Sequence, residues 1–209
     1  MLALASSLFA DNGKELKLAS PDGTHEIVFY QKQVSPAVNE LCYRVDYKSQ
    51  PVVNESRAGL ELDNRIWEMA LGVRNLKQPA CWMDNLEVDS VTYQPETNLT
   101  WQPLYGERSS VRDHYRAGTL CLSKKDNSGY RLNIEVRAYN EGVAFRYFFP
   151  EHPKAIFHKV VGDLTEYALP AGTKAWTEQW AQAFFERLNI DDIKHPAERA
   201  LTFELPNGK

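Results

Sequence analysis

The segment from Trp176 to Arg187 contains the residues best suited to bind a sugar. It reads Trp-Thr-Glu-Gln-Trp-Ala-Gln-Ala-Phe-Phe-Glu-Arg, so the indole rings of Trp176 and Trp180 stand near the carboxylates of Glu178 and Glu186. Sugars present apolar C–H faces beside hydroxyl groups, and their binding sites combine aromatic faces with oxygen acceptors. The same carboxylates are ligands that a hard cation such as Ca²⁺ prefers. A plainer interpretation stays open, in which both Trp side chains pack in the core and both Glu side chains are solvated.

The motifs of common catalytic and metal sites do not occur in this sequence. It has no Gly-rich dinucleotide or phosphate loop, no Gly-x-Ser-x-Gly and no His-Glu-x-x-His, and the EF-hand pattern is missing. Cys42, Cys81 and Cys121 lack zinc-ligand spacing, so we expect free thiols packed in strands. The polar cluster at residues 112–116 includes His114, and ion pairs along a strand explain it without catalysis.

The composition is that of an ordinary globular protein. Of 209 residues, 43% are hydrophobic and 25% charged, which excludes disordered and fibrous classes. The net charge of −4 gives no reason to expect nucleic acid or an anionic membrane as a partner. Residues 1–10 are apolar and small but too few to span a bilayer, and they resemble part of a secretory signal. We therefore expect no membrane span, and export rather than a disordered N-terminus.

Alternating apolar and polar residues are the dominant pattern, as in half-buried β-strands. The clearest case is residues 130–138, where Tyr130, Leu132, Ile134, Val136 and Ala138 share one face. Further strands are expected at 15–19, 26–31, 41–48, 59–62, 86–93, 119–123, 143–149 and 200–205. Many short strands separated by turns predict an all-β fold, an antiparallel two-sheet sandwich or barrel.

One stretch, residues 176–190, has a helical rather than an alternating pattern. Trp176, Trp180, Phe184 and Leu188 recur every four residues, which predicts a short packed helix or an ordered loop with this stripe in the core. We expect one β domain over residues 11–209. The final strand pattern runs into Pro206-Asn207-Gly208, which is how a hairpin begins, so the domain is expected to be incomplete at its C-terminus.

Three longer segments carry a resemblance to a known family. They are Trp101-Gln102-Pro103-Leu104-Tyr105-Gly106-Glu107-Arg108, Val111-Arg112-Asp113-His114-Tyr115, and Arg137-Ala138-Tyr139-Asn140-Glu141-Gly142-Val143-Ala144-Phe145-Arg146-Tyr147. Residues 18–23 and 197–205 also fit. Together they resemble the N-terminal domain of glycoside hydrolase family 97, a family of bacterial exported α-glucosidases and α-galactosidases.

The resemblance implies a β-super-sandwich like that of sugar mutarotases, followed in the family by a (β/α)8 barrel with the catalytic carboxylates. No barrel is present in this sequence, so we expect no catalytic residues in this chain and no glycoside hydrolysis by it alone. Family members bind Ca²⁺ with barrel glutamates and one Glu from the N-terminal domain. Glu186 resembles that position, with Glu178 as the second choice. A bacterial periplasmic or cell-surface location is implied as well.

Two other functions stay open from the residues alone. A self-standing mutarotase-like epimerase needs a Glu base and a His acid in one pocket, for which His114 and His158 are candidates. A free carbohydrate-binding module would use Trp176 and Trp180 as stacking platforms. The sequence leaves two properties undecided because both depend on the barrel. One is whether the sugar is an α-linked glucoside or galactoside, and the other is whether hydrolysis inverts or retains the configuration at the anomeric carbon.

Overall fold

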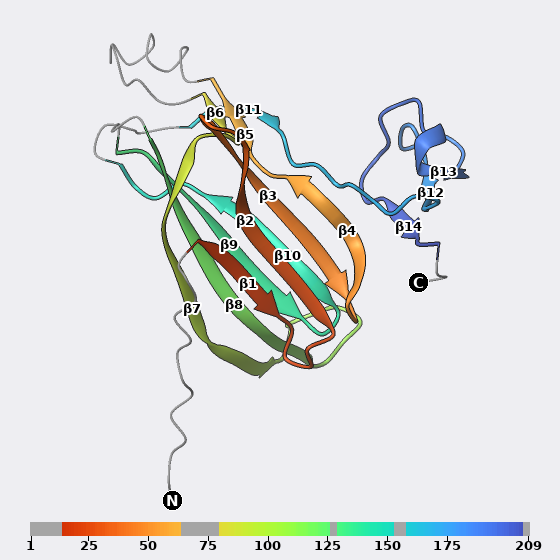
Figure 1. Cartoon of the computed structure of the whole chain (residues 1–209). Helices are drawn as coiled ribbons and strands as arrows, with labels where there is room; N and C mark the ends of the chain where they lie inside the picture. Colours follow the sequence, from red (N-terminus) through yellow and green to blue (C-terminus); the bar gives the residue numbers. More distant parts are fainter. Residues whose placement is uncertain (1–13, 64–79, 126–128, 153–157, 207–209) are drawn as a thin grey trace, which may run out of the picture.

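Two four-stranded antiparallel sheets face each other and form a sandwich (Figure 1). The computed structural model describes residues 14–63, 80–125, 129–152 and 158–206. The first sheet has the order β1-β2-β3-β4 and consists of β1 (Glu15–Ala19), β2 (His25–Ser35), β3 (Val38–Tyr47) and β4 (Gln50–Arg57). The second has the order β10-β9-β8-β7 and consists of β7 (Leu86–Trp101), β8 (Val111–Lys124), β9 (Arg131–Tyr139) and β10 (Gly142–Phe148).

Two smaller sheets accompany the sandwich. One has the order β11-β5-β6, with β5 (Leu60–Leu62), β6 (Cys81–Trp82) and β11 (Val160–Asp163). The other has the order β13-β12-β14, with β12 (Lys174–Thr177), β13 (Glu186–Asn189), the 3-10 turn η1 (Ile190–Asp192) and β14 (Thr202–Glu204). We call residues 170–206, which include this last sheet, the C-terminal lobe; it lies beside the sandwich in Figure 1.

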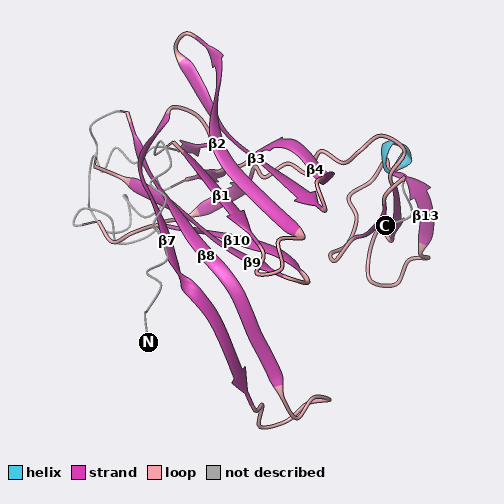
Figure 2. Ribbon diagram, turned by 60° about the horizontal axis from the view of Figure 1, so that its bottom comes forward, coloured by secondary structure: helices cyan, strands magenta, loops and turns pink. Residues whose placement is uncertain are grey.

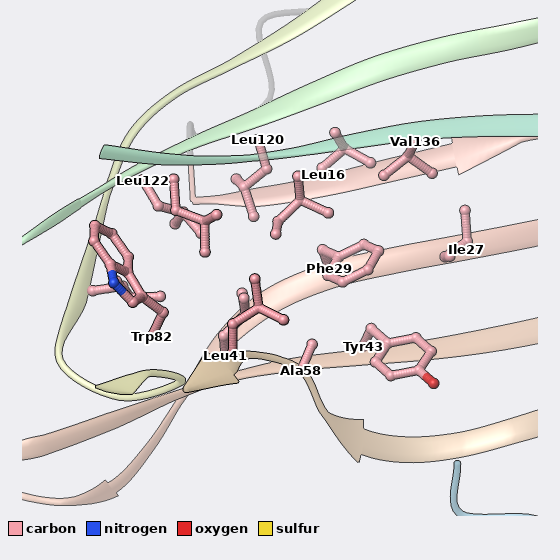
Figure 3. Close-up of a cluster of buried hydrophobic side chains, with 14 of the residues drawn as sticks. Leu16, Ile27, Phe29, Leu41, Tyr43, Ala58, Trp82, Leu120, Leu122 and Val136 are labelled. Carbon is pink, nitrogen blue, oxygen red and sulfur yellow. The ribbon is translucent and has the colours of Figure 1, made fainter. Parts of the chain in front are cut away.

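The core lies between the two large sheets because alternate residues of each strand point inward. Leu16, Ile27 and Phe29 come from the first sheet, and Leu120 and Val136 from the second; all are at most 1% exposed. Figure 3 shows these side chains pointing toward one another from both sides. Phe29 stacks on Tyr43 with ring centroids 5.3 Å apart, which ties neighbouring strands of the first sheet together.

The hairpin of β7 and β8 reaches well beyond the rest of the sandwich (Figure 2). Residues 102–110 connect the two strands at its tip, and Leu104 and Tyr105 in this connection are almost fully exposed. The sandwich therefore carries apolar side chains on a projecting arm as well as in its core.

Residues 164–169, which we call the strap, run along β4 and lead from the sandwich to the C-terminal lobe. The backbone N–H of Glu166 donates to Arg57 O at 2.9 Å, and that of Asn54 donates to Ala168 O at 2.7 Å. The Glu166 carboxylate accepts from Arg57 Nε at 2.9 Å, and this hydrogen bond holds the pKa of Glu166 below its usual range. The strap thus occupies the outer edge of the first sheet.

The predicted all-β sandwich is confirmed, and all nine predicted strands correspond to observed ones. The five alternating residues of segment 130–138 are all buried. Strand β4 was missed because Pro51 and the polar residues after it break the alternation that marks a strand. Cys42, Cys81 and Cys121 are free thiols, as expected.

The predicted packed helix at residues 176–190 is wrong, and the ordered loop is the correct alternative. The segment runs from β12 through a loop into β13. Its periodic stripe is not core either, since Phe184 is 92% exposed and Trp180 is 55% exposed. The residues of the four-residue spacing are distributed over a strand, a loop and a second strand. The backbone N–H and C=O groups of β12 form hydrogen bonds with β13 and β14 instead of the hydrogen bonds of a helix.

In the part of the chain that the structure describes, no helix is long and apolar enough to cross a membrane. The signal-like residues 1–10 and the turn residues 207–209 lie outside the described residues.

Candidate functional site

An open pocket of about 330 Å³ on the C-terminal lobe brings together three of the four residues predicted to bind ligands. Glu178, Trp180 and Glu186 line it, together with Leu188 and His195. The pocket thus combines an indole ring, two carboxylates and an imidazole on one surface. These are groups that bind hydroxyls, apolar sugar faces or hard cations.

The pairing of β12 with β13 places the two carboxylates. Thr177 lies opposite Glu186 in the antiparallel register, and Glu178 follows Thr177 directly where β12 ends. The chain turns within the intervening loop, where the backbone N–H of Ala183 donates to Trp180 O at 2.8 Å. Two glutamates eight residues apart in sequence therefore meet at the same end of this hairpin.

A second segment closes the pocket from the other side. The backbone N–H of Glu198 donates to Glu178 O at 2.9 Å, which holds residues 193–198 against the end of β12. Lys194, His195 and Pro196 line the pocket from this segment. The pocket therefore consists of the hairpin loop on one wall and the segment after η1 on the other.

Trp176 lies outside this pocket. In β12 the side chains of Ala175 and Thr177 are buried, so Trp176 points to the opposite, exposed face of the strand. There the Arg187 guanidinium lies 5.1 Å from the centre of its ring, and Arg187 Nε also donates to Glu204 at 3.0 Å. The two tryptophans predicted as a joint stacking platform are therefore separated, and Trp180 alone belongs to the pocket.

The carboxylate pair fits the chemistry of a hard cation but supplies few ligands. Ca²⁺ takes six to eight oxygen ligands, and Glu178 and Glu186 contribute at most four carboxylate oxygens. Within the described ranges, no group of three or more His, Cys, Asp or Glu side chains is arranged to hold a metal ion. A Ca²⁺ ion at Glu186 would therefore need oxygen ligands from elsewhere.

The aromatic residues beside Glu186 were missed as site residues by the sequence analysis. Phe184 lines the pocket, and Phe185 next to it is also largely exposed. The adjacent aromatic pair beside Glu186 was a signal in the sequence, but it did not show that the two rings are exposed rather than packed in the core. His195 gave no such signal, because it is distant in sequence and is brought to the pocket only by the fold.

His114 forms a hydrogen-bonded pair with Glu96 on the β7–β8 hairpin, at 2.7 Å from Nε2 to Oε1. Arg116 Nε donates to the other oxygen of Glu96 at 3.0 Å. The hydrogen bond from His114, followed by that from Arg116, holds the pKa of Glu96 below its usual range. A lowered pKa makes a carboxylate a weaker base, so Glu96 is suited to a structural ion pair with Arg116 rather than to the role of the epimerase base.

Comparison with known proteins locates the chain in a family. Residues 18–209 match the family model described as Glycosyl-hydrolase 97 N-terminal. A retaining alpha-galactosidase of Bacteroides thetaiotaomicron is 26% identical over 175 residues, which are 84% of this chain and 22% of that protein.

Solved structures show the same fold. A glycoside hydrolase family 97 enzyme from Pseudoalteromonas sp. strain K8, solved in complex with panose, has a TM-score of 0.76 at 24% identity, covering 92% of this chain and 27% of that one. A beta-arabinopyranosidase has a TM-score of 0.61 at 17% identity, covering 78% of this chain and 22% of that one. The chain therefore spans about a quarter of the length of these relatives. Because the family model matches well over half of it, this chain belongs to the N-terminal domain family of glycoside hydrolase family 97.

Proposed function

We propose that the chain is the carbohydrate-binding and scaffolding N-terminal domain of an exported α-glycosidase. In this proposal it forms one wall of an active site whose catalytic barrel comes from another part of the enzyme, and it supplies one ligand to a Ca²⁺ ion. The observation that carries the proposal is the lobe pocket, where Glu186 and Glu178 lie with Trp180. The relatives named as a retaining alpha-galactosidase and as an enzyme bound to panose support an α-linked galactoside or glucoside as the substrate.

Glu186 is the proposed calcium ligand, and Glu178 is the second choice. Both carboxylates line the open lobe pocket, where ligands from a barrel can complete the coordination. A bound Ca²⁺ supplies positive charge that stabilises negative charge nearby. The contribution of this chain is to hold the Glu186 carboxylate at the end of β12 and β13, and to place the Trp180 ring and Phe184 beside it.

Calcium binding can be tested with terbium as a probe, because Tb³⁺ prefers oxygen ligands as Ca²⁺ does and emits when a nearby tryptophan is excited. We expect weak, Ca²⁺-competed Tb³⁺ emission from the chain. Because the chain supplies few ligands, the dissociation constant should lie at the weak end of protein Ca²⁺ sites, about 10⁻⁴ to 10⁻³ M. Glu186→Gln should remove the signal, and Glu61→Gln, a control in β5 and outside the lobe, should leave it unchanged. Emission that is the same in Glu186→Gln as in the parent chain would overturn the assignment.

Activity tests the proposed place of the domain in an enzyme. This chain alone should not hydrolyse p-nitrophenyl α-glucoside or α-galactoside, because the family's catalytic carboxylates have no counterpart in it. In an enzyme that includes the barrel, Glu186→Ala should reduce the Ca²⁺-dependent rate more than Glu61→Ala does. Cell fractionation tests export, since a cytoplasmic enzyme would contradict that part of the proposal.

The second candidate, a free carbohydrate-binding module, is favoured by the exposed ring of Trp180 in the pocket. Titration of tryptophan fluorescence with maltose and melibiose separates the two. Saturable quenching that is lost in Trp180→Ala and kept in Trp176→Ala indicates an independent binder, because only Trp180 lies in the pocket. An unchanged spectrum indicates a wall that binds sugar only together with the barrel.

A further inference from the structure

A groove of about 450 Å³ lies on the outer face of the second large sheet, the face that points away from the core. Its size is within the range of about 300–1,000 Å³ in which proteins bind small ligands. The strand register brings its side chains together in neighbouring rows across the sheet, and side chains of one row point to the same side. One row contains Gln94, Ala117, Arg137 and Ala144, and the next contains Tyr115 and Tyr139. We call the surface that these residues line the sheet groove.

The floor of the sheet groove is low because its central side chains are small. Ala117 and Thr119 of β8 line the groove and are 6% and 9% exposed. They stand on the outer side of the sheet, because a Cβ on the intervening Gly118 would lie 3.1 Å from Leu16 in the core. Longer side chains of β7, β8 and β9 border them, so a depression forms on a sheet face.

Three side chains at one end of the sheet groove hold one another in place. The guanidinium carbon of Arg137 lies 4.4 Å from the ring centre of Tyr115, and Arg137 Nη1 donates to Tyr139 Oη at 3.3 Å. The ring centres of Tyr115 and Tyr139 are 5.1 Å apart. Arg137 is therefore oriented before a ligand arrives, which lowers the entropy lost on binding.

Arg137 keeps most of its hydrogen-bonding capacity for a ligand. A guanidinium has five N–H donors, and the hydrogen bond to Tyr139 uses one of them. In the described part of the chain, no carboxylate forms an ion pair with Arg137. Arg146 at the other end of the groove differs, because its Nη2 lies 2.6 Å from Glu135 Oε2. The groove thus has one guanidinium that is available and one that is neutralised.

Gln94 supplies the complementary group on the β7 side of the groove. Its Nε2 donates to Thr119 Oγ1 at 3.2 Å, which leaves the amide oxygen as an acceptor. Sugars present apolar C–H faces and hydroxyls that both donate and accept, and the tyrosine rings, Arg137 and Gln94 match these groups. One available cation is too little for a nucleic acid, which is bound through several phosphates.

We infer that the sheet groove binds a short stretch of a neutral saccharide chain, with a sugar ring on Tyr139 and sugar hydroxyls on Arg137 and Gln94. The groove shares no residue with the lobe pocket, so this is a second and separate site. It holds carbohydrate without taking part in calcium binding or hydrolysis. The inference therefore goes beyond the proposed function, and only the choice of α-linked probes rests on that function.

Isothermal titration calorimetry of the 209-residue chain tests the binding. The probes are maltoheptaose, a chain of α-linked glucose, and stachyose, which contains α-linked galactose; both are neutral. We expect saturable binding of at least one of them. Arg137→Gln should weaken that binding at least about tenfold, because hydrogen bonds to a charged group are among the stronger ones. Absence of binding for both saccharides at millimolar concentration would overturn the inference.

Arg131→Gln is the matched control for Arg137→Gln. Arg131 is exposed on the same strand and the same face as Arg137, six positions away. That separation is about 20 Å along a strand, too far for Arg131 to reach the groove. Arg131→Gln should therefore bind the saccharide as the parent chain does. Equal losses of affinity in the two variants would mean that charge alone attracts the sugar, and would contradict the site.

Substitutions of Tyr139 separate the role of its ring from that of its hydroxyl. Tyr139→Ala removes the stacking surface and should weaken saccharide binding about tenfold, whereas Tyr139→Phe keeps the ring and should retain most of the affinity. A stack that only stabilises the sheet gives a different result. In that case Tyr139→Ala lowers the melting temperature and leaves the affinity of the folded protein unchanged, which would overturn the inference.

Two further results separate this site from the proposed function. Saccharide binding that is lost in Trp180→Ala and kept in Arg137→Gln would place the sugar in the lobe pocket and overturn the inference. In an enzyme that includes the barrel, a failed Glu186→Ala test with intact binding in the sheet groove would remove only the proposed function. The reverse result, calcium-dependent activity that needs Glu186 and no binding that needs Arg137, would remove only the second site.

Discussion

The sandwich and the C-terminal lobe use similar residues in opposite ways. In the sandwich, aromatic side chains such as Phe29 and Tyr43 are at most 1% exposed and lie between the two layers. In the lobe, Trp180, Phe184 and Phe185 are exposed, and the buried residues of its strands are the small Ala175 and Thr177. The lobe has one sheet of three short strands, and no other described part of the chain forms a second layer on it, so its large apolar residues do not pack in a core. Aromatic residues therefore stabilise the fold in one region and are available to a ligand or a partner in the other.

The largest expected effect comes from removing a phenylalanine in each region. Phe29→Ala should destabilise the chain by about 3–5 kcal/mol, because Phe29 packs on Tyr43 and Phe145 in the core. Phe184→Ala should change stability by less than about 0.5 kcal/mol, because its ring contributes little buried area. Urea unfolding measures both. A loss of stability in Phe184→Ala as large as that in Phe29→Ala would show that the lobe has a core of its own.

A smaller effect is expected from adding a methyl group where the sandwich is tightly packed. A Cβ on Gly59 would lie 2.5 Å from Trp82 O and 2.7 Å from Met83 Cα, both backbone atoms that cannot move independently. Gly59→Ala should therefore cost about 1–3 kcal/mol.

Gly162→Ala is the matched control for that substitution. The nearest atoms to its added Cβ belong to the flexible Glu61 side chain, at 3.3 and 3.4 Å. Thermal unfolding should show a clear decrease in the melting temperature for Gly59→Ala and little change for Gly162→Ala. Equal melting temperatures would mean that the backbone around β5 and β6 adapts more easily than its packing indicates.

The smallest effect concerns pH and the turn between β1 and β2. Asp22 Oδ1 accepts hydrogen bonds from Ser20 Oγ at 2.7 Å, from Thr24 N at 2.9 Å and from Thr24 Oγ1 at 2.8 Å. These bonds, led by that from Ser20, lower the pKa of Asp22 to about 2. The pKa of Asp22 is lower in the folded than in the unfolded chain, so the ionised carboxylate stabilises the folded state. This stabilisation is fully present above the unfolded pKa of about 4 and is lost as pH falls toward 2.

Asp22→Asn should remove this part of the acid dependence. We expect the stability difference between the parent chain and Asp22→Asn to be larger at pH 6 than at pH 2.5, measured by urea unfolding at both values. Glu61→Gln, on an exposed position of β5, serves as the comparison and should not reproduce that change. A difference for Asp22→Asn that stays constant with pH would contradict the role of the turn.

Much of the fold follows from local pattern, and much less of the site does. Alternation located β1 and β9 to within a residue at either end, because each strand of a two-layer fold buries every second side chain. The pattern failed for residues 176–190, where exposed aromatic residues imitate the buried stripe of a helix. Local sequence cannot distinguish a large apolar side chain with a partner layer from one without it.

The sequence by itself determined the all-β class, the strand faces of the core and, through its motif segments, the family. These depend on residue types at short spacing, where backbone geometry and burial are coupled directly. The tertiary structure alone decided that Glu178, Trp180 and Glu186 share a pocket while Trp176 does not. It also decided that the strap covers β4, whereas β9 is the only strand that pairs with β10 among the described residues. Those arrangements depend on antiparallel register and on contacts between residues far apart in the chain, and no short segment encodes them.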